Sequence, residues 1–247
     1  MLYTEMQFLS SSLGMNTRVL ALIPQDRSFA VYGKDKNRFR VLYLLHGFSG
    51  DETCWMRLTS IERYAERYGI AVIMPRADRY YYCNFLGCKY YDYISSELNE
   101  MIPYYFNVSG QREDTYVAGL SMGGYGALKL ALRSPEKYRA CAALSPVTDW
   151  VGASKGMPEV IGEGYVCPPE DDLYHLAANY PASLQKPDIF IGCGTEDVLY
   201  PHSTAFRDEL KRLGYPLTYR ESHGIHNWDF WDEYIVYALD FFFGNRA

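Results

Sequence analysis

The chain has 247 residues, of which 48% are hydrophobic and 22% are charged, as is typical of a globular protein. This length allows one large domain or two small ones, with a core large enough to fold without disulfides. The net charge of −6, with no basic run, argues against nucleic acid or an anionic membrane as the main partner.

The N-terminus has no basic segment followed by a long apolar one, and no stretch of about 18 apolar residues occurs anywhere. We therefore expect no signal peptide and no membrane span, with a leader already removed as the alternative. The six cysteines form no CxxC pair and show no zinc-ligand spacing, so reduced thiols in a cytoplasmic protein are expected, with no metal or cofactor. Cys83 and Cys88 are the best candidates for a disulfide if that expectation fails.

Apolar runs that favour strands alternate with stretches at helical spacing. Strands are expected at 18–24, 38–47, 70–75, 115–120, 139–146, 187–194 and 217–222. Helices are expected at 60–69, at 92–106 with an interruption near Pro103, from the end of strand 115–120 to about 133, at 204–213 and at 229–243. Continuous apolar strands separated by helices predict a mostly parallel sheet covered on both faces, with an antiparallel edge formed by the opening segment.

One stretch interrupts this alternation. Residues 147–186 are irregular and rich in Gly and Pro, and they lie between two expected strands. No repeat or linker divides the chain. We therefore predict a single domain over residues 1–247, with a cap or lid inserted at 147–186.

The residues GLSMG, Gly119–Gly123, stand where the strand 115–120 becomes a helix. This G-x-S-x-G pattern in a strand–turn–helix context is typical of a nucleophile elbow, in which a sharp turn exposes the serine hydroxyl and requires small neighbours. Ser121 is therefore the predicted nucleophile. The amide of Met122, at the start of the helix, points toward a developing oxyanion.

A serine hydroxyl needs a base and an acid that orients the base, and in this arrangement they follow in the order acid, then histidine. Asp197 comes directly after the strand 187–194 and is the predicted acid. His226, shortly before the last helix, is the predicted base, with His223 as the alternative. Weaker candidates for the acid are Glu196, Asp149 and Asp229.

A second oxyanion donor is expected upstream, where His46 and Gly47 end the buried strand 38–47. The loop beyond them must turn sharply, so the amide of Phe48 can face the Ser121 hydroxyl. His46 stands outside the order of the triad and is interpreted as structural.

These motifs resemble the putative-esterase family of α/β-hydrolases. The resemblance rests on HGFSG (46–50), Trp55, GLSMGG (119–124), GTED (194–197) and GIHNW (224–228), and it covers nearly the whole chain. The family includes esterase D (S-formylglutathione hydrolase), feruloyl and acetylxylan esterases and mycolyltransferases, and the most similar branch is the tributyrin esterases. The resemblance implies an α/β-hydrolase fold, a Ser121–Asp197–His226 triad and oxyanion donors at Phe48 and Met122.

The resemblance implies a serine carboxylesterase acting on short-chain acyl esters, including acetyl or feruloyl esters of plant polysaccharide. An acyltransferase, an S-formylglutathione hydrolase and, least favoured, a catalytically silent binding module are the alternatives. The expected partner is a small-molecule ester, and self-association is plausible. Aromatic side chains are candidates for substrate contacts, with packing of the fold as the competing interpretation: Trp55, Tyr80, Tyr81, Tyr82, Phe85, Trp150 and Trp228.

Overall fold

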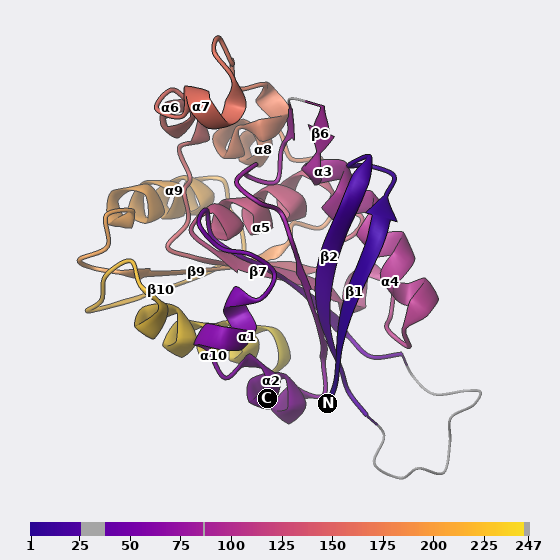
Figure 1. Ribbon diagram of the computed structural model, residues 1–247. Coiled ribbons are helices and arrows are strands. Elements are labelled where there is room, and N and C mark those ends of the chain that lie inside the picture. The colour runs from indigo at the N-terminus through magenta and orange to yellow at the C-terminus, as the bar shows by residue number, and fades with distance from the viewer. Residues whose placement is uncertain (26–37, 86, 245–247) are drawn as a thin grey trace.

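The computed structural model describes residues 1–25, 38–85 and 87–244, and within them eight strands form one sheet in the order β1-β2-β4-β3-β7-β8-β9-β10 (Figure 1). The strands are β1 (Leu2–Ser10), β2 (Met15–Ile23), β3 (Val41–Leu45), β4 (Ala71–Pro75), β7 (Thr115–Leu120), β8 (Ala140–Leu144), β9 (Asp188–Gly194) and β10 (Leu217–Ser222). β1 pairs antiparallel with β2, and β2 pairs antiparallel with β4, whereas β3, β4 and β7–β10 run parallel. The predicted sheet, with its antiparallel opening edge, is confirmed.

Helices cover both faces because both faces of the central strands are apolar. In β3, Leu42 and Leu44 point to one face, while Tyr43 and Leu45 point to the other. The first face is covered by α1 (Cys54–Leu58), α2 (Ile61–Tyr68) and α10 (Trp228–Phe243). The second is covered by a π-helical segment η1 (Tyr93–Leu98), α4 (Asn99–Tyr105), α5 (Met122–Arg133) and α9 (Tyr200–Arg212). None of the described helices combines the length and apolar character needed to cross a bilayer.

The helical stretch expected at 92–106 departs from its predicted form. It begins as the short helix α3 (Tyr90–Asp92), continues as the π-helical η1 and ends as α4, which contains Pro103. The break in the α-helical hydrogen-bond pattern therefore comes at 93–98, before the proline. A π-helical turn shifts the register by one residue, which the apolar spacing of the sequence does not reveal.

The segment 147–186 is more regular than its Gly and Pro content indicated. It contains α6 (Trp150–Ser154), α7 (Pro158–Ile161), a 3-10 turn η3 (Pro169–Asp171) and α8 (Leu173–Ala178). These helical segments are three to six residues long, too short for a periodic pattern to be recognised. The two-residue strands β5 (Asn84–Phe85) and β6 (Cys88–Lys89) were missed for the same reason.

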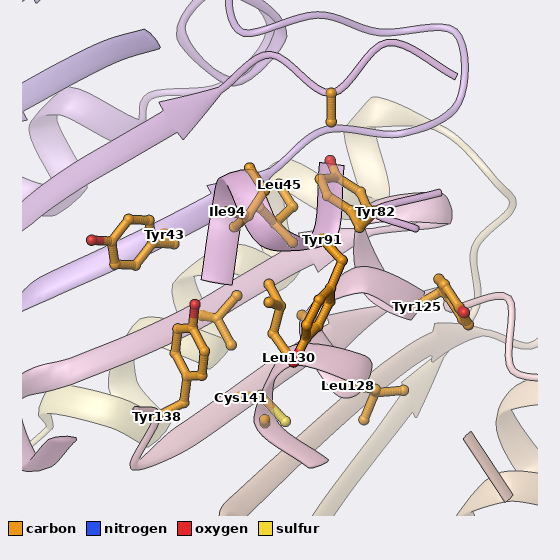
Figure 2. Close-up of a cluster of buried hydrophobic side chains, with 14 of the residues drawn as sticks. Tyr43, Leu45, Tyr82, Tyr91, Ile94, Tyr125, Leu128, Leu130, Tyr138 and Cys141 are labelled. Carbon is orange, nitrogen blue, oxygen red and sulfur yellow. The ribbon is translucent and has the colours of Figure 1, made fainter. Parts of the chain in front are cut away.

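Much of the unusual tyrosine content is buried beneath α5. Figure 2 shows Tyr43, Tyr82, Tyr91, Tyr125 and Tyr138 gathered with aliphatic side chains of the second face. Their hydroxyls have partners inside the protein, as a buried phenol requires. The bonds are Tyr43 to Leu98 O (3.3 Å), Tyr82 to His46 O (2.9 Å), Tyr125 to Asp171 O (2.6 Å), Tyr91 with Ser134 Oγ (2.7 Å), and Asn99 Nδ2 to Tyr138 (2.8 Å).

A buried ion pair fastens residues 147–186 to α5. Lys129 on α5 is fully buried, and its Nζ lies 2.5 Å from Oδ1 of Asp171 in η3. The same ammonium lies 3.1 Å from the carbonyl oxygen of Tyr82 and 3.1 Å from Cys83 Sγ. Two buried charges are stable only when each has its partner, so the segment and α5 hold each other in place.

We predict that Lys129→Met lowers the free energy of unfolding by about 3 kcal/mol, because the Asp171 carboxylate loses its nearer and fully buried partner and keeps only Arg133, at 3.3 Å, as an ionic partner. The double variant Lys129→Met/Asp171→Leu removes both charges and should recover a large part of that loss. Urea unfolding curves of the three proteins measure both effects. Equal stabilities of the single and double variants would show that the pairing of the charges is not what matters.

Candidate active site

Ser121 lies at the turn between β7 and α5, in a backbone conformation that is rare for a residue with a side chain. Its φ is 53° and its ψ is −115°. A Cβ on Gly119 would lie 2.4 Å from the carbonyl oxygen of Gly123, and one on Gly123 would lie 2.4 Å from that of Leu45. Larger residues at 119 and 123 would therefore force the turn apart, which explains the glycine on each side of the serine.

Three side chains from three loops meet beside this turn. His226 Nε2 lies 3.0 Å from Ser121 Oγ, and His226 Nδ1 lies 2.9 and 3.0 Å from the two carboxylate oxygens of Asp197. A carboxylate accepts, so Nδ1 carries the proton and Nε2 is free to accept from the serine hydroxyl. Of the two histidine candidates, the structure thus brings His226 to the serine.

The Asp197 carboxylate is buried, but its hydrogen bonds favour the ionised form. Burial acts to raise the pKa of Asp197, but hydrogen bonds from His226 and from the Leu199 amide (2.7 Å) outweigh it and lower the pKa. The imidazole of His226 packs edge-on against Trp231, whose Nε1 donates to Ser145 Oγ (3.2 Å). The acid and a rigid aromatic wall together fix the plane of the imidazole.

The loop after β3 lies against the serine and is held by a buried histidine. A Cβ on Gly47 would lie 3.7 Å from that of Ser121. His46 Nε2 accepts from the Ala77 amide (3.0 Å), so Nδ1 is the protonated nitrogen and donates to the Gly47 carbonyl oxygen (2.7 Å). This bond fixes the peptide between Gly47 and Phe48, and with it the direction of the Phe48 amide.

The two predicted oxyanion donors, Phe48 and Met122, flank Ser121 on its upstream and downstream sides. Among the described residues, neither amide has a hydrogen-bond acceptor. Met122 follows Ser121 in the chain and Phe48 lines the same cleft as Ser121, so both amides stay the predicted donors for an oxyanion.

Glu196 joins the loop that carries the acid to the loop that carries the histidine. Its Oε2 accepts from the Gly224 amide (2.7 Å), and its Oε1 lies 2.7 Å from His223 Nδ1. Its own amide donates to the Gly224 carbonyl oxygen (3.1 Å). These bonds, the Gly224 amide first, lower the pKa of Glu196 to about 2. The alternative acid and the alternative base thus bind each other next to the triad.

The other two acid candidates lie at helix starts. Asp149 caps α6, where it accepts from the Gly152 amide (2.7 Å), and Asp229 lies in the first turn of α10. Neither contacts His226 in the described structure. The described residues also contain no group of three or more metal-ligating side chains.

A cleft of about 530 Å³ opens beside Ser121, between α1 and the start of α10. Its lining residues are Gly47, Phe48, Ser49, Gly50, Cys54, Arg57, Leu58, Leu120, Ser121, His226, Asn227, Trp228 and Trp231. Helix α1 presents Cys54, Arg57 and Leu58 to the cleft. These residues are at positions i, i+3 and i+4, which lie on one face of a helix. The sequence indicates a helix near Trp55, but a five-residue helix shows no period that would identify these three residues as its cleft-facing side.

Of the aromatic residues proposed to contact substrate, Trp228 lines this cleft and the others do not. Trp55 is buried behind Trp228, edge-on to it, and its Nε1 donates to the Leu45 carbonyl oxygen (3.0 Å). Tyr81 and Trp150 are buried and stack on each other with ring centroids 4.1 Å apart. The remaining three pack into or against the core: Tyr80, Tyr82 and Phe85.

In the structure, all of these aromatic residues except Trp228 have the contacts of packed side chains, and contact with substrate stays a prediction. None of the described cleft-lining residues comes from 147–186 either. The loop tyrosines instead connect that segment to the body of the protein. Tyr81 contacts both Trp150 of α6 and Phe48 of the loop after β3, with ring centroids 5.6 Å apart in the second pair.

Comparison with known proteins gives consistent matches. The sequence model of the family described as "Putative esterase" matches residues 10–242. An acetyl esterase from Caldicellulosiruptor saccharolyticus is 28% identical over 256 residues, which cover 96% of each chain.

Two solved structures from Staphylococcus aureus are also similar. The substrate-bound fluorophosphonate-binding serine hydrolase F has a TM-score of 0.90 and 35% identity, and an S-formylglutathione hydrolase without ligand has a TM-score of 0.88 and 34% identity. Both comparisons cover 98% of this chain and 98% of the other.

We predict that Glu196→Ala lowers kcat about ten-fold or more with little change in KM, because the loop that carries His226 loses two of its bonds and small misplacements are costly in catalysis. Glu196→Gln keeps an acceptor for the Gly224 amide and should lose less. Steady-state kinetics of both variants on a 4-nitrophenyl ester measure this. An unchanged kcat in a folded Glu196→Ala protein would contradict it.

We also predict that the free energy of unfolding depends on pH through His46. Burial lowers the pKa of His46, so the folded protein keeps it neutral while the unfolded chain protonates it below about pH 6.5. The unfolded state then binds more protons, and the free energy of unfolding falls as pH falls, by up to about 1.4 kcal/mol per pH unit from this residue.

Urea unfolding of the wild type and of His46→Gln between pH 7.5 and pH 5 tests this dependence. The variant should show a shallower pH dependence, whereas the exposed His175→Gln should behave as the wild type. Equal slopes in the wild type and His46→Gln would show that His46 is not the group responsible.

Proposed function

The chain belongs to the "Putative esterase" family, and from this premise we propose that it is a serine carboxylesterase that hydrolyses short-chain acyl esters at Ser121. The observation that carries the proposal is the continuous hydrogen-bond chain from Ser121 through His226 to Asp197. That chain supplies what a neutral serine lacks, namely a base within reach and an acid that orients it.

In the acylation half of the reaction, His226 Nε2 takes the hydroxyl proton as Ser121 Oγ attacks the ester carbonyl carbon. The carbonyl oxygen becomes an oxyanion, which the amides of Phe48 and Met122 stabilise. The Asp197 carboxylate stabilises the imidazolium that forms. When the tetrahedral intermediate collapses, His226 gives its proton to the leaving alcohol and the acyl group remains on Ser121.

Deacylation repeats these steps with water. His226 removes a proton from a water molecule, and the resulting hydroxide attacks the acyl carbonyl carbon. The same two amides receive the oxyanion. His226 then returns the proton to Ser121 Oγ, and the carboxylic acid leaves.

The form of the cleft supports small substrates. Leu58, Leu120 and Trp231 give it apolar walls, and its volume of about 530 Å³ lies in the range of ordinary small-molecule sites. The 28% identical relative is named an acetyl esterase, in agreement with a short acyl group. Acetyl and feruloyl esters of plant polysaccharide are included among the proposed substrates.

Thioester hydrolysis is a second candidate, because one of the two Staphylococcus structures is named an S-formylglutathione hydrolase and is 34% identical. The same acyl-enzyme chemistry cleaves an ester or a thioester, so the triad favours neither. The leaving group is the part of the substrate that distinguishes the two activities.

We further propose one domain over the chain, with 147–186 as a cap that buttresses α5, and a cytoplasmic location. The buried Lys129–Asp171 pair supports the first proposal. Six cysteines without a disulfide in the described residues support the second. The net charge of −6 favours a small-molecule ester over nucleic acid or a membrane as the partner.

We predict that Ser121→Ala and His226→Ala each lower kcat/KM on 4-nitrophenyl acetate and butyrate by about 10⁴-fold or more, since the triad acts as a unit. His175→Ala, an exposed histidine on α8, is the matched control and should retain activity. The same assays with an octanoyl ester, methyl ferulate and S-formylglutathione rank the candidate substrates. Wild-type turnover by folded Ser121→Ala would rule out the mechanism.

A further inference from the structure

One outer edge of the sheet is the nine-residue strand β1. β1 stands at one end of the sheet order, and its one strand neighbour in the described structure is β2 (Figure 1). Its register with β2 runs unbroken from the pair Leu2–Ile23 to the pair Ser10–Met15, so no bulge distorts it. β1 also contains no proline, lysine or arginine. Three devices that proteins commonly use to block pairing at an edge, namely a bulge, a proline and a basic side chain, are therefore absent, and Glu5 is the one charged residue of the strand.

Exposed apolar side chains gather at this same edge. Leu2, Tyr3 and Leu9 of β1 are 44%, 43% and 69% exposed. On α4, which also lies at this end of the sheet, Tyr104 and Tyr105 are 82% and 64% exposed. Exposed apolar surface that is contiguous marks interaction sites, and Tyr3 and Leu9 share one face of β1.

The sequence of β1 is complementary to itself in one antiparallel register. A two-fold axis through its central residue, Met6, pairs all nine residues of the strand with those of a second copy. Tyr3 then lies opposite Leu9, and Glu5 lies opposite Gln7. An axis through Glu5 would instead place two like charges directly opposite each other, which is destabilising.

This pairing covers groups that are otherwise in water. Residues 2, 3, 5, 7 and 9 are exposed along β1, and of these 3, 5, 7 and 9 lie on the same face of the strand. In the Met6 register their side chains form two apolar Tyr–Leu pairs and two Glu–Gln pairs on one face of the joined sheet. Opposed residues in antiparallel strands have Cβ atoms about 4.5–5.5 Å apart, close enough for these pairs to interact.

We propose that β1 pairs antiparallel with β1 of a second copy of this chain, about a two-fold axis through Met6, so that two sheets become one continuous sheet. The edge amides and carbonyls supply the main-chain hydrogen bonds, and the Tyr3–Leu9 pairs select the register. The triad lies beyond the carboxyl ends of β7, β9 and β10, strands far from β1 in the sheet order. Dimer formation therefore does not depend on the esterase proposal.

Sedimentation velocity tests the dimer. The wild type should sediment as a species of about 57 kDa, twice the 28.5 kDa chain. Tyr3→Lys/Leu9→Lys places lysines opposite each other in both pairs and should sediment as a monomer with wild-type circular dichroism and esterase turnover. Val166→Lys, at an 83% exposed apolar residue of the cap, is the matched control and should remain a dimer.

A wild type that stays monomeric at high micromolar concentration would overturn the proposal. So would a Tyr3→Lys/Leu9→Lys protein that remains a dimer, because the contact would then lie elsewhere.

Cysteine cross-linking tests the register. Tyr3→Cys mixed with Leu9→Cys should give a disulfide-linked dimer on oxidation, whereas either variant alone should not, because its two new thiols would lie about 20 Å apart along the strands. Oxidised wild type controls for the six native cysteines. Cross-linking of either variant alone above that control, or none in the mixture, would contradict the Met6 register.

Discussion

The close backbone contact between the β7–α5 turn and the end of β3 is the constraint on which the rest of the structure depends. Gly123 packs against the Leu45 carbonyl oxygen so closely that no Cβ fits between them. The turn also holds Ser121, whose φ is 53°, close to Gly47. The nucleophile, the oxyanion loop and the start of α5 are therefore positioned by one piece of packed backbone.

Around that contact, buried polar groups hold the loops that carry the chemistry. His46 and Tyr82 tie the loop after β3 to the loop after β4, and Lys129 ties that second loop to the cap through Asp171. On the other side, Glu196 joins the acid loop to the histidine loop. These groups take no direct part in bond cleavage. They keep the reacting groups at hydrogen-bond distance, which a site built from separate loops cannot do alone.

The parts of the fold that could be predicted from sequence are those with long periodic patterns or strict steric requirements. β7 and α5 were located within a residue, because a buried strand, an elbow and a twelve-residue helix each restrict the sequence. The short helices of 147–186 and the π-helical turn at 93–98 were missed or misread because they are too short or too irregular to show a period. The loop aromatics were open to two interpretations, since a tyrosine that lines a cleft and one that packs a loop look the same in sequence. Burial, which decides between them, depends on tertiary contacts such as the stacking of Tyr81 on Trp150.

The central claim is that Ser121 is a nucleophile activated by its surroundings. Covalent labelling with a fluorophosphonate, followed by intact-mass measurement and peptide mapping, tests this most directly, because the reagent reacts with activated serines and spares ordinary ones. The account predicts one phosphonate per chain, located on Ser121, in the native protein and none after unfolding in urea. A labelled residue other than Ser121, or ester hydrolysis that continues in protein that takes up no label, would contradict it.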